Sequence, residues 1–138
     1  MNLTSFCESW PSSHASWPPV KESKLKFSFA VRENATVLHC HGRISYREEA
    51  AALSRKVAEL LPRTRHLILE LSDVEMIDGA GLGELVVVLL WAQAAGCSVQ
   101  LAAPRRNVRE LLELTNLASV FEICPSVKDA VKQQRATA

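Results

Sequence analysis

A glycine-rich junction in the middle of the chain holds the residues best suited to bind another molecule. The apolar run 67–71 leads to Asp78, and a helical pattern then begins with Gly79, Ala80, Gly81, Leu82 and Gly83. A strand that passes directly into a helix leaves N–H groups of the first helical turn without partners, and the helix dipole adds positive potential there. The junction is therefore suited to an anion or to an acidic group of a partner. Taken alone, the glycine-rich turn is explained equally well as a tight connection that requires small residues.

The spacing Gly79-x-Gly81-x-Gly83 is also that of a dinucleotide-binding turn. Such a site needs an acidic residue about 20 positions further on, at the end of the next strand, to hold the ribose. This chain has Ala102-Ala103-Pro104 there, and it contains no Lys-Ser or Lys-Thr pair typical of a phosphate loop. We therefore expect no cofactor.

Two histidines form the second group that could do chemistry. His39 and His41 are two residues apart on an expected strand, so they share a face, whereas Cys40 points to the other face. Two ligands are too few for a metal site, and neither His14 nor His66 is spaced to add a third. We expect ordinary histidines and no metal.

Acidic residues before the turn do not form a recognisable catalytic group. Ser72, Asp73, Glu75 and Asp78 lie close together in the chain, but no motif links a His or Lys to them. Asp73 and Glu75 have the pattern of solvated loop charges. We expect no enzyme and no catalytic residues.

Composition limits the classes of protein further. The chain has 138 residues, of which 48% are hydrophobic, so it can bury the core of one domain. Its formal net charge is +1 with Lys and Arg spread along the chain, which argues against nucleic-acid binding. The longest apolar run, Leu85–Ala92, is too short to cross a bilayer. Four cysteines without a Cys-x-x-Cys pattern, and no apolar signal segment in residues 1–20, predict a cytoplasmic protein that does not insert into membranes.

Residues 1–24 are rich in Ser and Pro, which predicts a flexible tail. The elements that must position the residues above follow this tail. Trp10 and Trp17 in this tail are candidates for partner contacts or for folding back onto the domain. The domain is expected to span residues 25–138.

Alternating strand and helix patterns predict a small α/β domain with a mixed sheet of about 4–5 strands and about 4 helices. A hairpin is expected from strands 27–31 and 36–41, which Gly42 closes, and an amphipathic helix from 46–61. Strand 67–71 is apolar enough to be central, and strand 98–102 is expected parallel to it. The remaining expected elements are a helix over 108–114 with Leu111 and Leu112 inward, an edge strand over 120–124, and a helix over 126–134 with Ser126 as N-cap.

Several of these segments together resemble the STAS domain, and in particular the stand-alone bacterial anti-sigma factor antagonists. The resemblance covers about residues 25–131. It rests on Leu69-Glu70-Leu71-Ser72, the turn Ile77–Gly83, Ala95-Gly96 before a strand, Pro104 after it, and the segment Val108–Leu117 with its Leu-Leu-Glu-Leu-Thr run. It implies a non-enzymatic interaction module that binds an anti-sigma factor, or a related regulatory kinase that uses ATP, and so regulates sigma-factor-dependent transcription.

In that family the position of Ala80 is commonly a Ser or Thr that the anti-sigma factor phosphorylates to release the antagonist. Alanine has no hydroxyl, so this off-switch is missing and the resemblance implies a constitutive binder. If Ala80 is the N-cap of the helix, it also lacks a side-chain cap, and Asp78 is expected to replace it.

The helix after the turn is apolar on more than one face. Leu82, Leu85, Val86 and Leu89 form one face, yet Val87, Val88, Leu90 and Trp91 are apolar as well. Taken singly, Trp91 fits the core slightly better than an interface, but the family binds through the start of this helix, which favours a partner for the face as a whole. The predicted partner-binding residues are Asp78, Gly79, Ala80, Gly81, Leu82, Gly83, Val87 and Trp91.

Two other functions remain open. STAS-like proteins also occur as small cytoplasmic subunits of lipid-transporting ABC systems, and a STAS module could sense a nucleotide or anion at the helix N-terminus. The sequence also leaves open whether the protein forms a homodimer.

Overall fold

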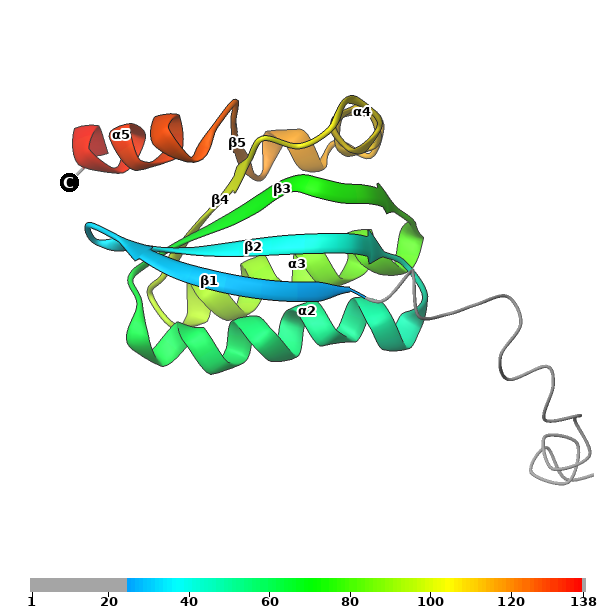
Figure 1. The fold of residues 1–138 in the computed structure, drawn as a ribbon, viewed down its shortest axis with the longest axis horizontal. Coiled ribbons are helices and arrows are strands. Elements are labelled where there is room, and N and C mark those ends of the chain that lie inside the picture. The colour runs from blue at the N-terminus through cyan, green and yellow to red at the C-terminus, as the bar shows by residue number, and fades with distance from the viewer. Residues whose placement is uncertain (1–24, 138) are drawn as a thin grey trace, which may run out of the picture.

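The computed structural model describes residues 25–137, which form a five-stranded sheet with helices on both faces (Figure 1). The strands are adjacent in chain order, β1 to β5. The elements are β1 (Lys26–Arg32), β2 (Ala35–Ile44), α2 (Arg47–Leu60), η3 (Leu61–Arg63), β3 (His66–Ile77), α3 (Gly79–Ala94), β4 (Ser98–Ala102), α4 (Arg106–Leu114), η4 (Leu117–Ser119), β5 (Glu122–Cys124) and α5 (Val127–Thr137). The predicted fold class is confirmed; the predicted tail, with Trp10 and Trp17, lies outside the described residues.

The predicted hairpin is present. β1 and β2 are antiparallel, and Glu33, at the turn between them, adopts a φ of 57°. Gly42 does not close the second strand as predicted, because β2 continues through it to Ile44. Gly42 instead has a φ of 116° beside an irregularity in the pairing with β3, a conformation that glycine tolerates best.

The central strand β3 is much longer than predicted. Asp73 and Glu75 lie within it and not in a loop, because its second half pairs with β2 as far as Ile77. Residues past Glu70 have no partner in β4. Side chains at the start of α4 bond to this free edge instead: Arg105 Nε donates to the Ser72 carbonyl at 2.9 Å, and Asn107 Nδ2 donates to the Glu75 carbonyl at 2.7 Å.

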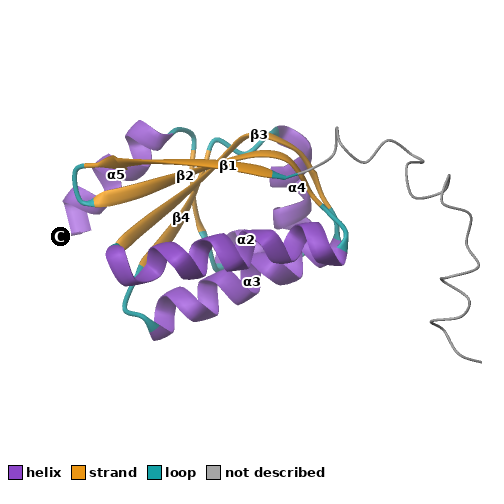
Figure 2. Ribbon diagram, turned by 60° about the horizontal axis from the view of Figure 1, so that its bottom comes forward, coloured by secondary structure: helices purple, strands orange, loops and turns teal. Residues whose placement is uncertain are grey.

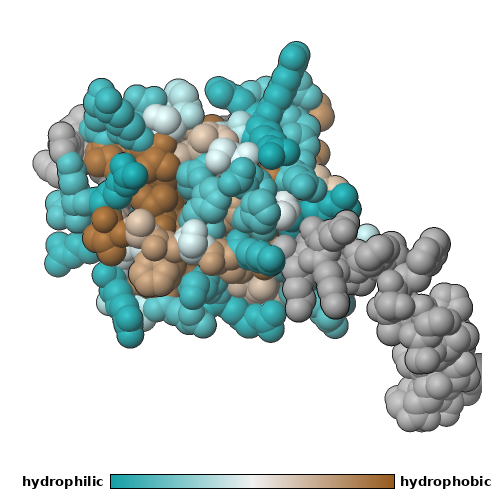
Figure 3. Space-filling view, viewed as in Figure 1, coloured by the Kyte–Doolittle hydropathy of each residue, from teal (hydrophilic) through white to brown (hydrophobic). Residues whose placement is uncertain are grey.

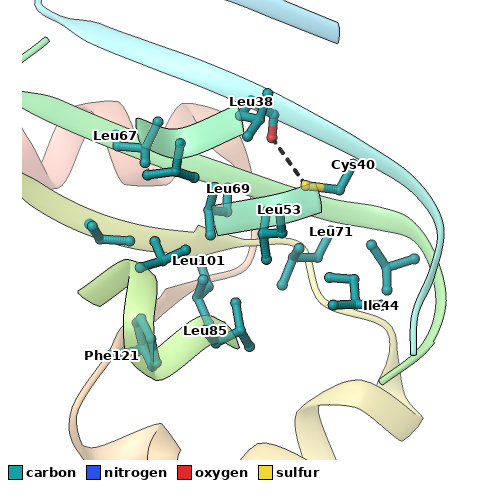
Figure 4. Close-up of a cluster of buried hydrophobic side chains, with 14 of the residues drawn as sticks. Leu38, Cys40, Ile44, Leu53, Leu67, Leu69, Leu71, Leu85, Leu101 and Phe121 are labelled. Atoms are coloured by element: carbon teal, nitrogen blue, oxygen red, sulfur yellow. Dashed lines mark hydrogen bonds between the residues drawn. The ribbon is translucent and has the colours of Figure 1, made fainter. Parts of the chain in front are cut away.

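The sheet separates two apolar clusters. Figure 2 shows α2 and α3 side by side on one face, while α4 and α5 lie on the other. The larger cluster fills the space under α2 and α3 and includes Leu38, Leu53, Leu69, Leu85 and Leu101, all fully buried (Figure 4). The smaller cluster lies against α5 and includes Ala35, Val37, Ile68, Ala102, Cys124 and Ala130. Successive residues of β3 therefore enter both clusters, as a covered central strand requires.

The C-terminal part follows the sequence pattern closely. β4 has the predicted bounds and is parallel to β3. In α4 the buried residues are Val108 and Leu112, whereas Leu111 is only partly buried. Ser126 caps α5 as predicted, because its Oγ accepts the Asp129 N–H at 3.1 Å. None of the helices within residues 25–137 is long and apolar enough to span a bilayer.

Candidate partner-binding surface

The turn between β3 and α3 is held by the carboxylate of Asp78. Asp78 is the N-cap of α3, and its Oδ1 accepts the Gly81 N–H at 2.9 Å. Its Oδ2 accepts the Tyr46 N–H at 3.0 Å, so the same side chain also holds the residue that precedes α2. Tyr46 has a φ of 61°, an unfavourable conformation for a bulky residue. Asp78 thus replaces a cap at Ala80, as predicted, and Ala80 is the second residue of the helix.

The bonds to Asp78 also favour its charged form. Partial desolvation alone would raise the pKa of this carboxyl, but the backbone N–H groups of Gly81, Tyr46 and Ala80 outweigh it. The pKa of Asp78 is therefore lower than its usual value. A charged carboxylate close to the N-terminus of α3 also interacts favourably with the helix dipole.

Gly81 is buried and serves the fold. A Cβ atom at this position would lie 2.0 Å from the Ile44 carbonyl oxygen and 2.8 Å from Cγ2 of Ile77. Only glycine allows α3 to begin this close to the end of β2. Of the predicted contact residues, Gly81 is thus turned into the molecule and presents no side-chain surface to a partner.

The other residues of the turn lie at or near the surface. Gly79 and Gly83 are exposed, and a Cβ atom at either would meet nothing within 4 Å. Ala80 and Leu82 are partly buried and pack against the larger cluster. The turn therefore offers a partner mostly backbone and small apolar groups.

The exposed side of α3 continues the surface of the turn. The helix buries Gly81, Leu85, Val88 and Ala92. Of the face Leu82, Leu85, Val86 and Leu89, Leu85 is fully buried, and Leu82 and Leu89 are partly buried against the larger cluster. On the opposite side, residues spaced by three, four or eight positions form one stripe. We call this set the outer stripe; it consists of Gly79, Gly83, Val87, Leu90 and Trp91.

The outer stripe contains no charged residue, although much of it faces solvent. Trp91 is 43% exposed and Leu90 is 57% exposed, so Trp91 lies at the surface and not in the core. Leu90 is absent from the predicted contacts, although its apolar character on an outer face was a signal for it. Tyr46, 63% exposed, lies beside the turn through its bond to Asp78. No sequence signal points to Tyr46, because 32 residues separate the two.

A second apolar area lies at the hairpin end of the sheet, where Figure 3 shows apolar side chains at the surface. β1 exposes Phe29 and Val31. The Lys56 ammonium lies 5.8 Å from the centre of the Phe29 ring, so α2 partly covers this area. The outer stripe has no such cover within the described residues.

The residues considered for catalysis do not gather at the turn. Asp78 bonds only to backbone N–H groups, whereas Asp73 contacts His39 on β2. Glu75 pairs with Arg43 at 3.5 Å. His66 bonds to Ser98, away from the other two described histidines. His39, His41 and Asp73 do come together, which the sequence did not indicate.

Comparison with known proteins identifies relatives of this architecture. A Thermotoga maritima protein named "Putative anti-sigma factor antagonist" is 35% identical over 69 residues, which are 50% of this chain and 61% of that protein. The chain spans about three fifths of the length of the curated relatives it matches.

Two solved structures share the fold. An anti-sigma factor antagonist from Mycobacterium paratuberculosis has a TM-score of 0.73 at 21% identity, covering 82% of this chain and 96% of that one. The Bacillus cell fate determinant SpoIIAA in its phosphorylated form has a TM-score of 0.60 at 14% identity, covering 78% and 98%. The family model of the STAS domain matches residues 26–130. The chain therefore belongs to the STAS domain family and resembles its anti-sigma factor antagonists.

Proposed function

We propose that this protein is a non-enzymatic antagonist that binds an anti-sigma factor of the ATP-using kinase type through the turn Asp78–Gly83 and the outer stripe. One observation carries the proposal: the helix that begins at the turn exposes an uncharged, largely apolar stripe. A small domain rarely leaves contiguous apolar surface in water unless a partner covers it. Trp91 is also of the residue type most often found at the centre of interfaces.

The dimensions of the surface suit one protein partner. Gly79 and Trp91 are 12 residues apart, which is about 18 Å along a helix. A standard interface buries roughly 800 Å² on each partner, or an area about 30 Å across. The turn, the exposed ring of Tyr46 and the outer stripe fit within such an area.

The second part of the proposal is that binding is constitutive. SpoIIAA, a structural neighbour, is known in a phosphorylated form. The resemblance puts the phosphorylated residue at the position of Ala80, which has no hydroxyl to accept a phosphoryl group. A phosphate would add about 1.5 to 2 negative charges beside apolar surface and would oppose docking there. With Ala80 this repulsion never arises.

The experiment is affinity purification of the tagged protein from its own cells, with mass spectrometry of the co-eluting proteins. We expect the native protein to recover an ATP-binding anti-sigma factor. Ala80→Glu should lose this partner, and so should Gly79→Glu, whose new side chain points into open space and leaves the packing of Ala80 untouched. Ser119→Glu adds the same charge on the exposed surface of η4 and should keep the partner.

The constitutive part is tested with the recovered partner and ATP. The native protein should stay bound and keep its mass, whereas Ala80→Ser should gain one phosphate and dissociate. Phosphorylation and release of the native protein would contradict the constitutive state. Binding that survives Gly79→Glu would remove the turn from the interface. Recovery of ABC transporter subunits would favour a transport role, and a thermal shift with nucleotides alone would favour a sensor.

A further inference from the structure

We propose that His39, His41 and Asp73 form a binding site for a divalent transition-metal ion of the zinc class on the sheet face that carries α4 and α5. The site does not depend on the proposed function, because it lies on β2 and β3 and shares no residue with the turn or the outer stripe.

The three side chains come together with ligand atoms close to one another. Their nearest nitrogen and oxygen atoms all lie within 4.8 Å. His39 Nε2 is 2.8 Å from Asp73 Oδ2, and His41 Nδ1 is 3.9 Å from the same oxygen. In a tetrahedral zinc site with bonds of about 2.1 Å, ligand atoms are about 3.4 Å apart. The widest separation among the three atoms is at most 4.8 Å, so shifts of up to about 0.7 Å in each atom would bring all three onto one ion.

A β-bulge places the carboxylate there. His39 is opposite Glu70 and His41 is opposite Asp73, so β3 uses one residue more than β2 over this stretch. In a regular strand Glu70 and Asp73 would point to opposite faces, but the extra residue turns both to the face of His39 and His41. Side chains satisfy the irregular backbone: the Ser72 N–H donates to Glu70 at 2.7 Å, and the Ser72 carbonyl accepts from Arg105.

Glu70 contacts the ring nitrogen of His39 that faces away from the proposed ion. Its carboxylate contacts His39 Nδ1, so His39 can direct Nε2 at an ion while it donates its other N–H to a carboxylate. This pairing is typical of histidine ligands, because it fixes the orientation of the ring and raises its basicity. The Glu70 side chain is only 14% exposed, whereas that of His41 is 62% exposed. The site is therefore held by a mostly buried carboxylate and is accessible from solvent at His41.

The surrounding charges favour a cation. Glu70 and Asp73 contribute two negative charges next to two histidines, and the nearby Arg43 is paired with Glu75. Cys40 takes no part, because it is fully buried on the opposite face and burial raises the pKa of its thiol to about 12. Two imidazoles and one carboxylate suit Zn²⁺ better than Mg²⁺ or Ca²⁺. Three protein ligands leave a coordination position for water or for a group from another molecule.

Metal binding replaces the contact between His39 Nε2 and Asp73 Oδ2 with a bond from Nε2 to the ion. The competing description is a permanent pairing of His39 with the two carboxylates, with no affinity for metal.

The test is isothermal titration of the tag-free full chain with Zn²⁺, in a background of Cys7→Ser and His14→Ala that removes the thiol and imidazole ligands of residues 1–24. We expect one ion per chain. His41→Gln and Asp73→Asn should each weaken binding at least tenfold, and both should fold because these side chains are well exposed. Glu70→Gln should weaken binding by about 10- to 100-fold without removing a ligand. His66→Gln is the matched control and should bind as the unaltered background does.

Circular dichroism of each metal-free variant separates loss of ligands from loss of fold. Saturable Zn²⁺ binding that falls with His41→Gln and Asp73→Asn, but not with His66→Gln, would establish the site. Absence of saturable binding, or equal binding by His41→Gln and the unaltered background, would overturn the proposal in favour of a permanent pairing of His39 with the carboxylates. Neither result bears on partner capture through the turn, so the two proposals are tested separately.

Discussion

Replacement of Gly81 by alanine offers a direct test of how the turn is built. The new Cβ would lie 2.0 Å from the Ile44 carbonyl oxygen, where carbon and oxygen atoms not bonded to each other need more than 3 Å. The obstacle is backbone at the end of β2 and cannot rotate away. The start of α3 must therefore move by about 1 Å, which lengthens the 2.9 Å bond from the Gly81 N–H to Asp78 beyond useful range.

The expected loss of stability can be worked out from these contacts. Overpacking in a closed site costs about 1–3 kcal/mol. Loss of the cap costs about 1 kcal/mol more. Alanine regains up to about 1 kcal/mol through its higher helix propensity. We expect Gly81→Ala to lower the free energy of unfolding by about 1–3 kcal/mol.

Gly83→Ala is the matched control, since it lies two residues further along α3 and a Cβ there meets nothing within 4 Å. It should raise the free energy of unfolding by about 0.5–1 kcal/mol, because only the propensity changes. Urea unfolding followed by circular dichroism measures both variants under one set of conditions. Equal stability of Gly81→Ala and Gly83→Ala would show that α3 does not begin against β2, and the account of the turn would fail.

Two further predictions concern titratable groups. Because the pKa of Asp78 is lowered on folding, its charge contributes stability that is present above the unfolded value of about 3.9 and is lost as the pH falls through the folded pKa. Asp78→Asn keeps one acceptor oxygen for the Gly81 N–H but cannot also accept the Tyr46 N–H, so it should cost about 1 kcal/mol at neutral pH. It should also flatten the acid limb of a plot of unfolding free energy against pH; an unchanged acid limb would contradict the bonding of Asp78. Cys40 is fully buried, and its thiol pKa is raised to about 12 by burial and by the charge of Glu70. Mass spectrometry should find Cys40 unmodified by iodoacetamide at pH 8 in the folded protein and modified in urea, whereas rapid modification of the folded protein would place the thiol at the surface.

Most elements of the fold could be predicted because residues close together in the chain determine them. The hairpin, the apolar run of β3 and the Ser126 cap each follow from residues close together in the chain. The length of β3 was missed because its second half carries polar residues whose backbone bonds come from β2 and from side chains of α4. That support is tertiary and leaves no local pattern.

In the candidate sites too, the features set by neighbouring residues could be predicted, whereas contacts between distant segments could not. Asp78 as the cap follows from residue type and position, but its second bond, to Tyr46, joins segments 32 residues apart. The meeting of His39 and His41 with Asp73 depends on a bulge in β3. A period-two pattern assigns Asp73 to the opposite face, so the sequence suggested two ligands where the fold supplies three.

The two hydrogen bonds that the Asp78 carboxylate accepts bear on the thermodynamics of recognition. Together they join the starts of α2 and α3, which are distant in the chain, so the backbone of the turn is ordered before any ligand arrives. A molecule that docks there loses little affinity to the ordering of loops, a cost that flexible binding surfaces carry. Association at this turn should consequently resemble the meeting of two rigid bodies, with a rate set by diffusion and orientation and not by a slow rearrangement of the protein.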